Sequence, residues 1–170
     1  MIGNFCSWHL KYNSTKKRTL LILNQGAHFH SMETFAGSFD QFVSLFNTIA
    51  HPNGFVVFRA TVPGHFDCWN QFSPGIPVEN MTYDKFLDRY ATPMYDWNLF
   101  DSYNHYAKKR LLQDLAPTVI KHYLNVYNMT VLRADQHVRA NDCLHYMSPG
   151  PIDWWNHLLF TNLVLSLIHI

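Results

Sequence analysis

The sequence predicts an α/β fold with a parallel sheet, and its first half carries that prediction. Thr19–Asn24 and Phe55–Ala60 are short apolar runs without alternation, which is typical of strands covered on both faces in a parallel sheet. Between them, Met32–Ala50 has the periodicity of an amphipathic helix. A strand, a helix and a second strand joined by short links predict a right-handed crossover unit.

The predicted helix is defined by a stripe of aromatic side chains. They recur at steps of four, three and four residues, and we expect all of them in the core: Phe35, Phe39, Phe42 and Phe46. Ser31 is the expected N-cap, and the Pro-Asn-Gly turn at residues 52–54 ends the helix.

The second half of the chain has a weaker pattern. Thr61–Asn98 contains four prolines and predicts a long connection of the kind that is usually functional or lid-like. Tyr103–Tyr127 has helical spacing, but Pro117 splits or kinks it, so that one helix and two short helices both remain open. The rest predicts a third strand, a loop and a closing helix, respectively Met129–Leu132, Arg133–Pro151 and the residues from about Asp153.

The composition limits the class of protein. A chain of 170 residues with 48% apolar and 15% charged residues fits one globular domain. The net charge of +1 provides no basic field for a phosphate backbone, so we expect no nucleic-acid partner. No apolar run is long enough to span a bilayer, and Met1–Asn13 lacks the apolar segment of a secretory signal.

Cysteines and glycosylation sequons give further hints. Cys6, Cys68 and Cys143 show no paired spacing, which argues against a zinc ribbon and allows one disulfide with one leftover thiol. Three N-x-S/T sequons, at Asn13, Asn80 and Asn128, are candidate glycosylation sites and favour a secretory protein.

The motif Asp142-Cys143-Leu144-His145 carries chemistry. A carboxylate three residues before a histidine can accept the Nδ1 proton of the imidazole and leave Nε2 free to take a proton from a hydroxyl. Such a contact requires an oxygen of Asp142 within roughly 3 Å of His145 Nδ1. An ordinary surface pair is the alternative interpretation of this motif taken alone.

The residues from Asp142 to Leu159, DCLHYMSPGPIDWWNHLL, resemble the carboxy-terminal signature of the PC-esterase superfamily, which includes the plant trichome-birefringence-like polysaccharide O-acetyltransferases. Three upstream blocks resemble the same family in the same order: ILNQGAH (Ile22–His28), VFRATVPGHFDCW (Val57–Trp69) and LRADQH (Leu132–His137).

This resemblance implies an SGNH/GDSL-like three-layer α/β/α fold and a Ser-His-Asp triad that transfers acyl groups without a cofactor or metal. In such a triad His145 is the base and Asp142 orients it. The implied partners are an acyl donor and a glycan acceptor, and the implied location is the secretory pathway, either the Golgi or the extracellular space.

The resemblance also suggests residues around the reacting group. Asn24 and Gly26 follow the first strand, where open α/β sheets bind ligands, and are expected oxyanion donors that share one open space with His145 Nε2. His28 ends the same block as a further substrate contact. Arg59 and His65 match the next block and can hold an acyl carbonyl or a sugar hydroxyl, although Arg59 can equally anchor the long loop.

Two further expectations depend on the resemblance. Met147 stands where plant members carry a second cysteine, so Cys68 and Cys143 are the pair expected to form a disulfide. Trp154 and Trp155 are candidate sugar platforms, and we expect at least one of them in the core.

The sequence departs from the family where the serine should be. The G-D-S block should precede ILNQGAH, but only Met1–Arg18 stands there, and Ser7 has neither the Gly-Asp context nor a preceding strand. We therefore expect residues 1–18 to lie outside the family domain, residues 19–170 to be a partial domain truncated at its first strand, and the chain alone to be inactive.

Two alternatives to a catalytic acyl-transfer domain remain open. A remnant without the serine can act as a carbohydrate-binding or inert domain. A histidine-metal hydrolase built from His28, His30 and His65 is the other alternative, although scattered histidines more often serve in polar packing.

Overall fold

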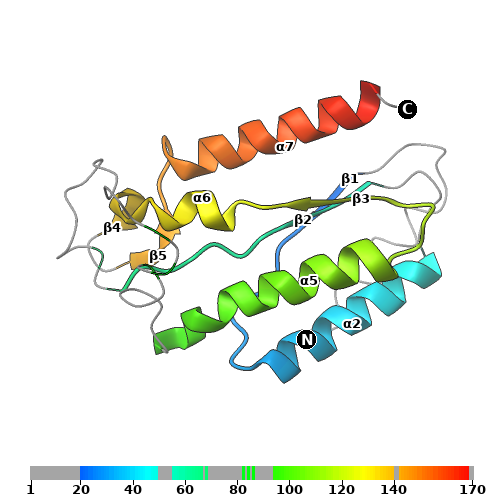
Figure 1. Ribbon diagram of the computed structural model, residues 1–170, viewed down its shortest axis with the longest axis horizontal. Helices are drawn as coiled ribbons and strands as arrows, with labels where there is room; N and C mark the ends of the chain where they lie inside the picture. Colours follow the sequence, from blue (N-terminus) through cyan, green and yellow to red (C-terminus); the bar gives the residue numbers. More distant parts are fainter. Residues whose placement is uncertain are drawn as a thin grey trace.

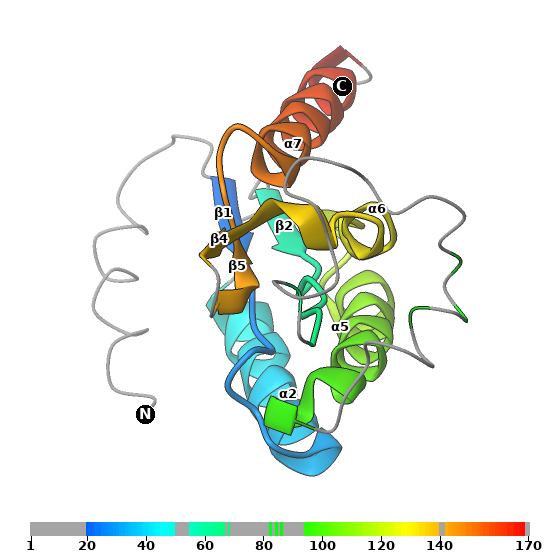
Figure 2. The same cartoon turned by 90° about the vertical axis from the view of Figure 1, so that its left-hand side faces the viewer.

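The computed structural model describes residues 20–49, 55–66, 68, 82, 84, 86, 94–139 and 142–168. Its centre is a parallel sheet with the strand order β1-β2-β3. The helices α2 and α5 cover one face of this sheet and α7 covers the other, so the described chain forms three layers (Figures 1 and 2). This arrangement confirms the predicted α/β class and is consistent with an SGNH-like fold.

The predicted strand, helix and strand are present in the first half. β1 spans Leu20–Leu23, α2 spans Met32–Ile49 and β2 spans Phe55–Arg59. β1 and β2 pair in parallel, with Leu20 opposite Phe55. The Ser31 hydroxyl accepts a hydrogen bond from the Thr34 N–H at 3.2 Å, which confirms the expected cap because this N–H has no partner within the helix.

The aromatic stripe of α2 is only partly in the core. Phe35 and Phe39 are fully buried, and their rings pack against Tyr103 of α5 and Phe58 of β2. Phe42 and Phe46 are half-buried at the edge of the core. These two positions lie farther toward the carboxyl end of the helix.

The expectation that the first strand is covered on both faces was wrong. Among the described strands, β1 lies at the edge of the sheet; its side chains alternate between exposed and half-buried, and Leu20 and Ile22 are exposed. β2 lies between two strands and is buried along most of its length. An apolar run alone did not distinguish an edge strand from a central strand, because neighbouring elements decide which faces are covered.

The third strand was predicted in the wrong place. The helix α5 spans Phe100–Asp114, and β3 spans Ile120–Leu124 and pairs in parallel with β2. Pro117 ends the helical region, since proline has no N–H and disfavours helix in the residue before it. Beyond it, β-branched and aromatic residues favour a strand, and the helical spacing across Pro117 was coincidental.

Met129–Leu132, predicted as that strand, lies mostly in the short helix α6, Tyr127–Val131. Thr130 and Val131 are buried there, and the Thr130 hydroxyl donates to the carbonyl of Val126 at 2.6 Å. Packing overrides the strand preference of these β-branched residues.

Residues 133–150 are more ordered than the predicted loop. They contain the 3-10 helix η2 (Ala134–Gln136) and an antiparallel hairpin of β4 (His137–Arg139) and β5 (Asp142–Tyr146). The hairpin lies beyond the carboxyl end of β2, and the N–H of His65 donates to the carbonyl of Cys143 at 2.9 Å (Figure 1). The D-x-x-H motif therefore lies on a strand and not on a loop.

Two further helices belong to the described residues. The 3-10 helix η1 spans Met94–Leu99 and precedes α5, at the end of the long connection. The closing helix α7 spans Pro151–Ile168 and begins two residues before the predicted start. Within the described residues, no helix is long and apolar enough to cross a membrane.

Candidate active site

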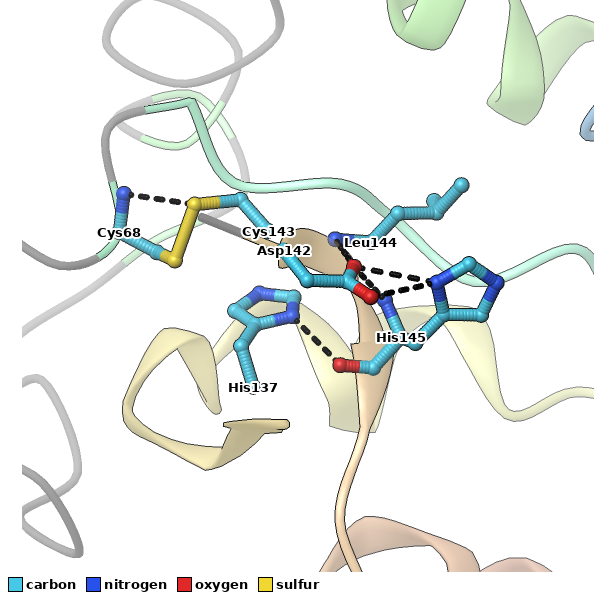
Figure 3. Close-up of polar contacts among 6 residues, drawn as sticks. All are labelled: Cys68, His137, Asp142, Cys143, Leu144 and His145. Carbon is cyan, nitrogen blue, oxygen red and sulfur yellow. Dashed lines mark hydrogen bonds and ion pairs between the residues drawn. A yellow bond between two sulfur atoms is a disulfide. The ribbon is translucent and has the colours of Figure 1, made fainter. Parts of the chain in front are cut away.

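Asp142 and His145 form a hydrogen-bonded pair on β5 (Figure 3). His145 Nδ1 donates to the carboxylate at 2.9 Å from Oδ2 and 3.0 Å from Oδ1, which matches the predicted contact. The imidazole is 74% exposed, and its Nε2 makes no hydrogen bond to the described residues. One ring nitrogen is thus held and the other can receive a proton.

The main chain of β5 orients the carboxylate. Asp142 Oδ1 accepts hydrogen bonds from the N–H of His145 at 2.9 Å and the N–H of Leu144 at 3.2 Å. An aspartate that bonds the N–H groups two and three residues ahead folds back over its own chain, which explains how a spacing of three brings the two side chains together on a strand.

The pKa of Asp142 is set by two opposing effects. Partial burial raises it, and the hydrogen bonds from His145 and Leu144 lower it by a larger amount. The pKa of Asp142 therefore lies below its ordinary value, and the carboxylate is ionised at neutral pH. An ionised carboxylate can stabilise the imidazolium that forms when His145 takes up a proton.

A disulfide links the hairpin to the segment that follows β2. Cys68 and Cys143 are joined across 75 residues of sequence, with their Cα atoms 5.6 Å apart. The N–H of Cys68 also donates to Cys143 Sγ at 3.1 Å. The expected pairing is therefore present, and it ties the residue next to Asp142 to the segment after β2.

A buried polar cluster consists of His65 and two residues of the hairpin itself, His137 and Tyr146. Nδ1 of His65 is 3.0 Å from Nε2 of His137 and 3.1 Å from the Tyr146 hydroxyl. Burial lowers the pKa of His65 to about 3 and that of His137 to about 4, so both rings are neutral at neutral pH. His65 is fully buried, so any effect of this residue on a substrate would be indirect.

The comparison with protein families matches residues 1–162 to the PC-esterase model, described as a GDSL/SGNH-like acyl-esterase family found in Pmr5 and Cas1p. The chain belongs to the PC-esterase family. Membership supports an acyl-esterase or acetyltransferase type of function and confirms the resemblance drawn from the sequence blocks. No curated protein and no solved structure matches the chain significantly.

The match includes the first eighteen residues, which we had placed outside the family domain. The boundary predicted at residue 18, Ser7 and Cys6 all lie outside the described residues.

The expected oxyanion donors of this PC-esterase lie at the carboxyl end of β1. Asn24 is exposed, and its side-chain Nδ2 donates to the carbonyl of Arg59 at 2.9 Å and the hydroxyl of Thr61 at 3.3 Å. Gly26 is buried so closely against Thr61 that a Cβ there would collide with the Thr61 side chain. These bonds fix the segment after β1 to the segment after β2.

No hydrogen bond joins Asn24 or Gly26 to Asp142 or His145 in the described part of the chain. The shared open space between the two pairs therefore stays a prediction. A polar pocket is present elsewhere, between α5 and the end of β3, where Lys108 and Tyr123 contribute to its lining.

Arg59 lies at the end of β2, where its side chain contacts the main chain of Ala60 and the ring of Trp155. Its Nη1 donates to the carbonyl of Ala60 at 3.1 Å, and its guanidinium lies 5.3 Å from the Trp155 ring centroid. Trp155 is half-buried and its Nε1 donates to the Thr130 hydroxyl, whereas Trp154 is exposed. One tryptophan thus packs on the core, as expected.

The remaining candidate residues do not gather into one site. His28 and His30 are exposed on the chain after β1, and His30 pairs with Asp96 at 2.7 Å, whereas His65 is buried. Within the described ranges, no group of three histidine, cysteine or acidic side chains could hold a metal. Asn128 is exposed on α6, and the sequons at Asn13 and Asn80 lie outside the described residues.

Sequence reasoning gave His137 no role, although it ends the block LRADQH. A histidine at a block end could have been singled out, but its contact with the main chain of β5 depends on the hairpin. That hairpin was predicted as a loop.

Proposed function

We propose that this protein is a serine-dependent acyl esterase or O-acyltransferase whose acyl acceptor is a glycan hydroxyl or water, with His145 as general base and Asp142 as its orienting carboxylate. The observation that carries the proposal is the Asp142–His145 pair, with Nδ1 held at 2.9 Å and Nε2 free of hydrogen bonds to the described residues. Family membership supports the acyl chemistry, and glycan as acceptor follows from the sequence resemblance.

The proposed reaction proceeds in two steps. His145 Nε2 takes the proton of a serine hydroxyl as the serine oxygen attacks the acyl carbonyl, and the imidazolium then gives that proton to the departing alcohol. In the second step His145 deprotonates a glycan hydroxyl or water, which attacks the acyl-serine and releases the serine with its proton restored. Asp142 stabilises the imidazolium in both steps.

We place the nucleophile outside the described residues, because no serine hydroxyl there makes a hydrogen bond to His145. Asn24 and Gly26 are the proposed oxyanion donors. Asn24 Nδ2 would have to exchange its 3.3 Å bond to the Thr61 hydroxyl for one to the oxyanion, which the length of that bond favours.

We also propose that the protein follows the secretory pathway. Disulfides persist in oxidising compartments, and the Cys68–Cys143 bridge together with the exposed sequon at Asn128 supports this location.

The test compares two Asp–His pairs in the natively expressed protein. Hydrolysis of an aryl acetate and labelling by a fluorophosphonate are measured for wild type, Asp142→Asn and His145→Gln, with Asp101→Asn and His105→Gln as matched controls in a second pair on α5. We expect the first two variants to lose activity by about 10³-fold to 10⁴-fold and the controls to keep it.

Each other outcome has a definite meaning. Equal activity in Asp142→Asn and wild type would refute the triad. Glycan binding with neither turnover nor labelling would favour the binding domain instead, and labelling of Ser7 in the 170-residue chain would place the nucleophile there. Enzymatic deglycosylation that leaves the mass unchanged would remove the support from the sequons.

A further inference from the structure

His137 contacts the main chain of the candidate base from the buried side of the hairpin. Its Nδ1–H donates to the carbonyl oxygen of His145 at 3.1 Å (Figure 3). The ring is only 7% exposed, so it cannot itself reach a solvent-facing substrate. The reaction proposed above gives this histidine no part.

The position of the His137 ring is fixed by its neighbours. His65 Nε2–H donates to the carbonyl of Val131 at 2.8 Å, so His65 Nδ1 is unprotonated. His137 Nε2 lies 3.0 Å from this Nδ1 and is also unprotonated when His137 Nδ1 carries the proton, so the two rings are in contact without a hydrogen bond between these nitrogens. The ring of Tyr146 packs 4.4 Å from the His137 ring, and its hydroxyl donates to the carbonyl of Pro63 at 2.8 Å. Helix α6, the segment after β2 and strand β5 therefore all restrain the imidazole.

The contact matters because the His145 residue is held at two points of its main chain. Its N–H donates to Asp142 at 2.9 Å, and its carbonyl accepts from His137 at 3.1 Å. The pairing of β4 with β5 is irregular between His137 and Arg139, so a regular strand ladder is not what fixes this stretch. The direction of a side chain follows from the orientation of the two peptide groups beside it.

We propose that His137 is a positioning residue, which holds the His145 carbonyl and thereby keeps the main chain of β5 in the conformation that aligns Asp142 with His145. The consequence for catalysis rests on the proposed function. The structural part of the proposal can be measured without any turnover.

Three substitutions separate the contacts of the ring. An asparagine amide can occupy the place of Nδ1 and keep the hydrogen bond to His145, whereas a glutamine amide can occupy the place of Nε2 and keep the contact with His65. His137→Leu keeps neither contact. All three replacements are uncharged, so a comparison among them does not change the charge beside Asp142.

The main readout is the pKa of the Asp142 carboxyl, measured by carbon NMR on the full chain. The main-chain N–H groups of His145 and Leu144 lower this pKa, so it reports the conformation of β5. Amide hydrogen exchange of His145 is the second readout, and kcat and KM of the esterase reaction are the third. Circular dichroism verifies that each variant is folded.

We expect His137→Asn to keep the amide exchange and the kcat of wild type, and its Asp142 pKa is the reference for the other two variants, because the charge that wild-type His137 gains below about pH 4 also lowers the pKa of Asp142. In His137→Gln and His137→Leu, the pKa of Asp142 should rise toward the ordinary value, the His145 amide should exchange about tenfold faster, and kcat should fall about fivefold to tenfold at unchanged KM, since one hydrogen bond is lost. The Asn and Gln variants differ little in side-chain volume, so a difference between them in these readouts would not come from a change in packing.

Identical behaviour of the Asn and Gln variants in the first two readouts would overturn the proposal, even if His137→Leu is unstable. A changed Asp142 pKa in a protein with no esterase activity would leave the positioning role intact and refute the proposed function. Loss of activity in Asp142→Asn together with a normal kcat in His137→Gln would support the proposed function and refute the positioning role of His137.

Discussion

The exposed face of α5 and the hairpin region, residues 133–146, contain the same two kinds of side-chain pair, Asp with His and Asp with Arg. On α5, Asp101 pairs with His105 at 3.3 Å, and Arg110 pairs with Asp114. In the hairpin region, Asp142 pairs with His145 at 2.9 Å, and Arg133 pairs with Asp135 at 2.9 Å. Residue type and distance alone therefore do not distinguish the two regions.

The two regions differ in what else holds the carboxylates. Asp142 accepts hydrogen bonds from the main-chain N–H groups of Leu144 and His145 in addition to the one from the His145 imidazole. Asp135, whose side chain is fully buried, accepts two hydrogen bonds from Arg133 and one from the amide of Gln136. The pairs on α5 join residues four apart on a helix surface, where such contacts arise from helical geometry alone and contribute little. A carboxylate with a fixed orientation, rather than a short distance, characterises a candidate site.

The largest difference in stability should come from the disulfide that anchors the hairpin region. The double variant Cys68→Ser and Cys143→Ser should lose about 4 kcal/mol of unfolding free energy, because an open loop of this length gains chain entropy on unfolding. Urea unfolding of the variant and wild type measures this loss.

Adding a reductant to wild type should reproduce the loss, and adding it to the double variant should change nothing. Amide exchange should rise at His145 but not at His105 on α5. Equal changes at both residues would mean that the bridge stabilises the whole domain and not the hairpin region in particular.

The next effect should come from the matched arginines. Arg133→Met removes the cation from a fully buried carboxylate and should cost about 3 kcal/mol. Arg110→Met removes a cation from partly exposed partners, Asp40 and Asp114, and should cost at most about 1 kcal/mol. Chemical unfolding of both variants measures the difference, and similar losses would show that burial does not separate the two regions.

The buried histidines His65 and His137 should make the stability depend on pH. Burial lowers the pKa of His65 to about 3 and that of His137 to about 4, against an ordinary value of 6.5. Below about pH 6.5 these two histidines therefore bind protons in the unfolded chain but remain unprotonated in the folded chain. Their contribution to stability is complete above pH 6.5 and is lost as the pH falls toward about 4, by about 1.4 kcal/mol per pH unit for each histidine.

Unfolding free energies between pH 7 and pH 4 measure this slope. His137→Asn removes one of the two groups and should reduce the slope by about half. The lowered pKa values of Asp135 and Asp142 remove stability only below their ordinary value of 3.8, in a separate window. A wild-type curve that is flat from pH 6.5 to pH 5 would contradict the burial of the histidine pair.

Much of the fold's first half and the Asp142–His145 contact could be predicted from the sequence. A strand, a helix with an aromatic stripe and a serine cap are encoded locally, since each depends on residues within one turn or one strand. The D-x-x-H contact is also local, because the aspartate folds back over the next three residues. The Cys68–Cys143 bridge joins distant residues, and only the family resemblance suggested it.

The tertiary structure decided what local patterns leave open. Residues 120–124 became the third strand and residues 127–131 a helix because β2 offered a partner to the former and the core received side chains of the latter. His65 was expected near a substrate but lies fully buried, and His137 gained its contact with His145 only because the hairpin brought them together. The sequence by itself determined the identity of the candidate acid and base. The buried contacts that support them join residues up to 83 positions apart, for which no local rule exists.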